Sequence, residues 1–228
     1  MDNYIIGQLL LVIGIIISLV AQGYVMSSYS KYKKQENKKR LSGFEVARKI
    51  LDNNGLKDVY VTEVKGSLTD HYDPSRKVVR LSSDIFHGTT IASASVAAHE
   101  VGHAIQDKEN YAFMRFRSMI FPLVNIASYG GYFAILIGVI LGLTDFIWLG
   151  IGLEIIILIF QIITLPVEFN ASSRAKEKLK EYNILEKNEL DGSSAMLRAA
   201  ALTYVASVIT TLLQILRLIV MFAGRRDD

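Results

Sequence analysis

The chain has 228 residues, of which 51% are hydrophobic and 21% charged, with a formal net charge of +3. This composition, with a mean hydropathy of +0.31, is too apolar for an ordinary soluble domain. The chain has no cysteine, which excludes disulfides and thiolate metal sites. No basic stripe interleaved with aromatic residues is present, so we expect no nucleic-acid partner.

Four stretches are long and apolar enough to cross a bilayer as helices, which takes about 20 residues each. We expect a transmembrane anchor at residues 4–26, a transmembrane hairpin at 118–167 that turns at Asp145, and a last span at 199–224. The chain begins MDN, without the basic n-region of a cleavable signal peptide, so the first span is predicted to be retained.

Two polar segments, residues 27–117 and 168–198, separate these spans and carry 16 and six of the Lys and Arg residues. The link at Asp145 and the first residues MDN carry none. Because cytoplasmic loops are enriched in Lys and Arg, both segments are predicted to be cytoplasmic. The lipid bilayer is then a partner, and the protein is a multi-pass protein of the cell membrane.

The first polar segment has the pattern of a small α+β domain. Helical spacing of apolar residues, with Ser42 as a plausible N-cap, predicts a helix at 42–54. Residues 58–64 and 77–82 are rich in β-branched side chains and predict strands. A second helix is predicted at 89–106. The predicted fold is therefore a predominantly α-helical integral membrane protein, with four transmembrane helices and a small α+β cytoplasmic domain.

The predicted helix at 89–106 contains the stretch AAHEVGHAIQ. Residues i and i+4 lie on one face of a helix, so His99 and His103 can both reach one zinc ion. Glu100 lies to the side of that face, where it can accept a proton from an activated water. The neighbouring residues are small or apolar nearly all round, and two buried histidines without a partner would be costly. We therefore predict one Zn²⁺ per chain, with Glu100 as the catalytic base.

A catalytic zinc usually has three protein ligands, so a third His, Asp or Glu is expected on the same side of the membrane. Glu168 follows the third span directly, and Asp191 lies in the stretch ELDGSS. Leu-Asp-Gly is similar to the third-ligand motif of site-2-type intramembrane proteases. In that family the Asp lies on a membrane helix, whereas Asp191 precedes Gly192 and reads as a turn or N-cap. Glu168 is therefore favoured over Asp191.

The residues around Glu168 support this preference. If the helix continues past Pro166, a stripe of small residues follows Glu168, and the helix with the histidines has a matching stripe. Small residues on both sides allow two backbones to approach closely, so that a short carboxylate can reach the ion. The two stripes consist of Ala171, Ser172 and Ala175, and of Ser95, Ala98 and Gly102.

Several motifs together resemble the YugP-type membrane zinc metallopeptidases of bacteria, often called neutral zinc metallopeptidases. The resemblance covers nearly the whole chain and implies a gluzincin-like peptidase with a zincin-like cytoplasmic domain. Under it His99, His103 and Glu168 match zinc ligands, and Glu100 matches the catalytic base. The motifs are GSLTDHYDP (66–74), KVVRLS (77–82), VAAHEVGHAIQ (96–106), LPVEFNASSRA (165–175) and LRAAALTYVA (197–206).

The stretch EFNASSRA is also similar to the Glu-Phe-x-Ala-Asp stretch of the HtpX and CAAX-protease group. The present sequence departs from that group at Ser172, where those proteins carry an Asp that partners a ligand histidine. The partner of the ligand histidine in this chain therefore has to come from the structure.

Further residues are candidates for supporting roles. KVVRLS could be an edge strand to which a substrate adds as another strand, or an internal strand. The stretch DHYDP is more simply a turn ended by Pro74, and His87 is expected at the surface. Glu154 and Arg217 lie at similar depth inside spans three and four, so we expect an ion pair between them. Candidate donors to a tetrahedral oxyanion are His71, Tyr72, Arg174 and Tyr204.

These features favour a membrane-embedded zinc metalloprotease that hydrolyses peptide bonds of a peptide or membrane-protein substrate at the cytoplasmic face. One alternative is a site-2-type intramembrane protease with Asp191 as ligand. Another is a catalytically inactive zinc-binding membrane scaffold, but a scaffold needs the two histidines and has no need of Glu100.

Overall fold

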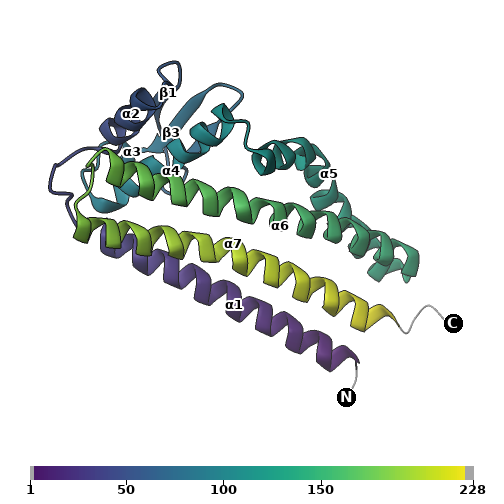
Figure 1. Cartoon of the computed structure of the whole chain (residues 1–228). Helices are drawn as coiled ribbons and strands as arrows, with labels where there is room; N and C mark the ends of the chain where they lie inside the picture. The colour runs from purple at the N-terminus through teal and green to yellow at the C-terminus, as the bar shows by residue number, and fades with distance from the viewer. Residues whose placement is uncertain (1–2, 224–228) are drawn as a thin grey trace. The chain divides into compact units, whose positions relative to one another are not determined.

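The computed structural model describes residues 3–223, and most of them are helical (Figure 1). Internal contacts divide the described residues into two compact units. The membrane unit comprises residues 3–22, 116–165 and 202–223, and the polar unit comprises residues 23–115 and 166–201. The elements are α1 (Asn3–Tyr32), α2 (Gly43–Asn53), β1 (Tyr60–Val64), β2 (His71–Asp73), β3 (Val78–Ser82), α3 (Ser83–Phe86), α4 (Ile91–Lys108), α5 (Ala112–Leu141), α6 (Thr144–Glu181) and α7 (Lys187–Phe222).

Four helices, α1, α5, α6 and α7, are long and apolar enough to cross a membrane, with mean hydropathy between 1.8 and 2.6 over their most apolar windows. Many of their large apolar side chains are exposed, including Leu19, Ile126 and Ile140. Apolar side chains around a helix without protein cover are typical of contact with lipid. Helices of the predicted kind are therefore present, and α6 and α7 extend well beyond the predicted spans.

The ion pair predicted within the membrane unit is absent. Among the described residues, Arg217 donates from Nη1 to Oε1 of Gln214 at 3.2 Å, and no ion pair joins it to Glu154. The rise per residue gave the two charges a similar depth, but depth says nothing about the direction in which each side chain leaves its helix. Gln214 lies one turn from Arg217 on the same helix and satisfies part of the guanidinium instead.

The polar unit is built around α2 and α4, which pack against each other. Ser42 caps α2 as predicted: its hydroxyl accepts from the Glu45 amide, and the Glu45 carboxylate accepts from the Ser42 amide. The apolar residues of α2 that carry the helical spacing, Val46, Ile50 and Leu51 among them, are fully buried. This core holds α4 in place.

The three strands form one sheet in the order β1-β3-β2, with β1 parallel and β2 antiparallel to β3. β3 is therefore the central strand, and the prediction that KVVRLS is an edge strand is wrong. Its nearly complete burial is the physical reason, since Val78, Val79 and Leu81 all lie in the interior. The stretch DHYDP supplies β2 and is not only a turn; Tyr72 pairs with Val79.

The backbones of α4 and α6 approach closely at Gly102. A Cβ atom at this position would lie 2.7 Å from the carbonyl oxygen of Ala171, closer than carbon and oxygen can pack. The predicted contact between two stripes of small residues is thus confirmed at this point. Further along α4, Ser95 turns to α7 instead, where its hydroxyl bonds the Ser193 hydroxyl at 2.7 Å.

We predict that Gly102→Ala destabilises the protein by about 1–3 kcal/mol, because the added methyl group forces α4 and α6 apart. Gly23→Ala is the matched control, since a Cβ there meets nothing within 4 Å and Ala favours a helix by up to about 1 kcal/mol. Thermal unfolding of the two variants in detergent measures the difference. A Tm for Gly102→Ala equal to that of Gly23→Ala would contradict the close approach.

Candidate metal centre

The helix α4 carries two of the three candidate ligands and is fixed at its beginning by Thr90. The Thr90 hydroxyl accepts from the Ser93 amide at 3.1 Å, which satisfies one of the amides that a helix start leaves without a partner. The helix then runs from Ile91 to Lys108, in agreement with the predicted helix. As the sequence indicated, it is buried on nearly all sides.

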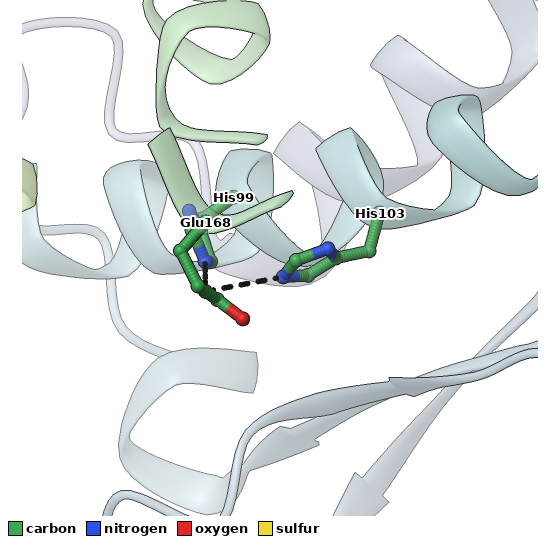
Figure 2. A group of neighbouring side chains, drawn as sticks. All are labelled: His99, His103 and Glu168. Atoms are coloured by element: carbon green, nitrogen blue, oxygen red, sulfur yellow. Dashed lines mark ion pairs between the residues drawn. The ribbon is translucent and has the colours of Figure 1, made fainter. Parts of the chain in front are cut away.

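The structure brings His99, His103 and Glu168 together (Figure 2). His99 and His103 lie one turn apart on α4, and Glu168 reaches them from α6. Its Oε2 atom lies 3.3 Å from Nε2 of His99 and 3.6 Å from Nε2 of His103. One ligand atom from each of the three residues lies within 4.8 Å of the other two.

These distances suit a tetrahedral metal ion. Two atoms that each sit about 2.0–2.1 Å from zinc at the tetrahedral angle are about 3.3–3.4 Å apart, close to the two measured separations. Imidazole nitrogens and a carboxylate oxygen are also donor types that zinc accepts, and a site with two His and one Glu leaves a fourth position for water or substrate. The side chains therefore fit zinc both in chemistry and in spacing.

The candidate centre lies in a nearly dry environment. Glu168 is 2% exposed, and His103 and Glu100 are each 8% exposed. Burial by itself lowers the pKa of His103, but the carboxylates of Glu168 and Glu100 outweigh it and raise the pKa above its usual range. The same negative charges would stabilise a bound cation, because electrostatic attraction is strong where water is excluded.

Each candidate ligand histidine has a hydrogen-bond partner on its second ring nitrogen. Nδ1 of His103 lies 2.9 Å from Oε1 of Gln106, and Nδ1 of His99 lies 3.2 Å from the hydroxyl of Ser172. Ser172, at the position where the related group carries Asp, thus contacts a ligand histidine here. Sequence reasoning missed Gln106, although a fully buried amide one turn after His103 is the kind of residue that orients a ligand.

The four candidate oxyanion donors lie in different surroundings. The Tyr72 hydroxyl donates to Asp107 at 2.9 Å, and burial together with this carboxylate raises the pKa of Tyr72. Arg174 pairs with Asn170 and Glu109. His71 is exposed, with Nδ1 2.7 Å from the Thr69 carbonyl oxygen. Tyr204 belongs to the membrane unit. No contact assigns an oxyanion donor among them, and their roles stay predictions.

Asp191, the alternative third ligand, lies on α7 and is exposed. It is neither a turn residue nor an N-cap, because α7 begins at Lys187 and already includes it. The buried carboxylate near this helix start is Glu189, which accepts from the amides of Lys38 and Glu186. Within residues 3–223, the group of side chains placed to share a metal ion contains Glu168 and not Asp191.

Two histidines one turn apart, a glutamate beside the first and a carboxylate from a second helix are the pattern of a zinc metallopeptidase. Comparison with known proteins agrees. The family model described as "Putative neutral zinc metallopeptidase" matches residues 8–223. The chain therefore belongs to this family, which confirms the resemblance seen in its motifs.

A curated relative shows the same likeness over almost the whole length. The protein named "Putative membrane protease YugP" from Bacillus subtilis (strain 168) is 48% identical over 212 residues. The alignment covers 93% of this chain and 94% of the relative. No solved structure matches the chain.

We predict that Glu168→Ala lowers the affinity for zinc by more than about 100-fold, since even partners of ligands contribute 10–100-fold. Asp191→Ala is the matched control and should bind zinc like the unchanged protein. Zinc content after purification, and competition with a chromophoric chelator, measure both. Full zinc retention by Glu168→Ala, or zinc loss from Asp191→Ala, would contradict the ligand assignment.

Proposed function

We propose that this protein is a membrane-anchored zinc metallopeptidase that hydrolyses peptide bonds at the cytoplasmic face of the membrane. The observation that carries the proposal is the spacing of Glu168 Oε2 from the two imidazole Nε2 atoms, 3.3 and 3.6 Å. The position of Glu100, between the two histidines in sequence and buried beside them, supports a hydrolytic role. Membership of the metallopeptidase family supports it as well.

The chemistry follows from the side chains present. Zinc bound by His99, His103 and Glu168 would polarise the substrate carbonyl and lower the pKa of the attacking water. Glu100 accepts a proton from that water as its oxygen bonds to the carbonyl carbon. Glu100 then returns the proton to the amine nitrogen as the C–N bond breaks. Its low exposure, 8%, keeps the carboxylate near the reacting atoms and away from bulk water.

The sheet offers an edge for an extended peptide next to α4. β2 is an edge strand, and the Tyr72 hydroxyl ties it to Asp107, one turn beyond His103 on α4. A peptide or an unfolded segment of a membrane protein that adds alongside β2 would have its main chain held by backbone hydrogen bonds. β3 is excluded from this role because both of its edges are already paired.

The orientation of the protein in the membrane rests on its charges. The polar unit contains nearly all of the 22 Lys and Arg residues of the two polar segments, and the link between α5 and α6 carries none. By the positive-inside rule the polar unit, and with it the candidate metal centre, faces the cytoplasm.

We predict that Glu100→Gln binds zinc normally but loses at least about 100-fold in peptide hydrolysis, because Gln cannot accept the proton from water. Cleavage of a fluorogenic casein substrate by the purified protein in detergent measures activity, and zinc content is measured on the same sample. An active Glu100→Gln variant would refute the general-base role. If the unchanged protein binds zinc but hydrolyses no peptide, the scaffold interpretation is favoured instead.

The absence of cysteine allows a clean test of orientation, because each introduced cysteine is the single thiol of the chain. Lys57 in the polar unit and Asp145 at the start of α6 are both exposed. In intact cells we expect a membrane-impermeant maleimide to label Asp145→Cys and not Lys57→Cys. After permeabilisation both should react. The reverse pattern in intact cells would place the metal centre outside.

A further inference from the structure

The side-chain amide of Gln106 is fully buried between α4 and α6 and uses both of its polar atoms. Its Oε1 lies 2.9 Å from Nδ1 of His103. Its Nε2 donates to the carbonyl oxygen of Val167 at 2.8 Å and to Oδ1 of Asn170 at 2.9 Å. Gln106 therefore contacts a candidate ligand on one side and two residues of α6 on the other.

The direction of these hydrogen bonds follows from groups that can act in one way only. Arg174 carries donors and no acceptor, so the atom of Asn170 that lies 2.7 Å from its Nε must be the carbonyl oxygen Oδ1. This oxygen, like the Val167 carbonyl, can only accept, so the atom of Gln106 that faces both must be the NH₂ group.

The same reasoning then reaches the metal centre. With its NH₂ group turned to α6, Gln106 presents its carbonyl oxygen to His103. An amide oxygen only accepts, so Nδ1 of His103 must carry the proton. In the neutral imidazole Nε2 is then without a proton, and its lone pair is available on the side where Glu168 lies.

We propose that Gln106 is a positioning residue that fixes His103 in the metal-binding tautomer, with Asn170 and Arg174 enforcing the orientation of its amide. The inference rests on the metal-ligand role proposed for His103. Gln106 also restrains the third ligand, because Val167, whose carbonyl it binds, directly precedes Glu168. One buried amide thus orients ligands on both helices.

The chain of hydrogen bonds ends at the surface. Arg174 is itself held by Glu109, whose carboxylate lies 2.6 Å from Nη2. Glu109 is the C-cap residue of α4, so the ion pair closes a loop from α4 to α6 and back. This explains why Arg174 serves the metal centre from a distance rather than as a donor to the substrate.

The other candidate histidine is held differently. Nδ1 of His99 faces the hydroxyl of Ser172 at 3.2 Å. A hydroxyl both donates and accepts, so it fits either tautomer of His99 and imposes neither. The two histidines are therefore not equivalent, and loss of the Gln106 amide should affect the metal centre more than loss of the Ser172 hydroxyl.

The first test is zinc affinity, measured by chelator competition in detergent. Gln106→Met keeps the length of the side chain without its hydrogen bonds and should weaken zinc binding by about 10–100-fold. Asn170→Asp keeps the oxygen that accepts from Gln106 and Arg174 and should bind much more tightly than Gln106→Met. Ser95→Ala is the matched control, because it removes a buried hydrogen bond from the same helix without touching a candidate ligand.

The second test reads the tautomer directly, without metal. Nitrogen-15 NMR of histidine-labelled apoprotein, at a pH where imidazoles are neutral, distinguishes the two ring nitrogens. The chain has four histidines, and a His103→Asn sample assigns the signal. We expect the proton of His103 on Nδ1 in the unchanged protein and on both nitrogens in exchange in Gln106→Met.

The outcomes separate this inference from the proposed function. A proton on Nε2 of His103 in the unchanged apoprotein, or zinc affinity in Gln106→Met equal to that of Ser95→Ala, would overturn the positioning role and leave the peptidase proposal intact. If the unchanged protein binds no zinc, the peptidase proposal fails, while the tautomer measurement still decides the role of Gln106.

Discussion

The close approach of α4 to α6 at Gly102 and Ala171 is the constraint on which the candidate metal centre depends. A glutamate side chain is short, and Oε2 of Glu168 reaches both imidazoles only because no Cβ separates the backbones at this point. Helices that pack through large side chains lie about 8–10 Å apart. The glycine is therefore as much a part of the centre as the residues that would bind zinc.

A second consequence of this packing is that polar groups are buried together. Glu168, His103 and Gln106 are each less than 9% exposed, and such groups are costly inside a protein unless they are bonded. The structure meets this requirement by joining them in one network between α4 and α6. The same low dielectric that makes the burial costly would make the hold on a cation strong, so stability and metal binding depend on one arrangement.

Local patterns predicted the elements well. The capping box at Ser42, the helical spacing of α2 and the histidine spacing of α4 all involve residues within one or two turns of each other, where short-range geometry decides. The errors concern partners far apart in sequence. The order of strands placed β3 in the centre, and Arg217 took Gln214 rather than Glu154, because neither strand order nor the direction of a side chain follows from spacing along the chain.

The sequence by itself therefore determined the class of the protein, its apolar helices and the pair of histidines with Glu100 between them. It also favoured Glu168 as third ligand through the small residues beside it. Only the tertiary structure decided which groups orient the ligands, since Gln106 and Ser172 acquire their roles from contacts between α4 and α6. Hydrogen-bond direction is a property of the assembled network, because each donor limits its neighbour, and no single stretch of sequence contains it.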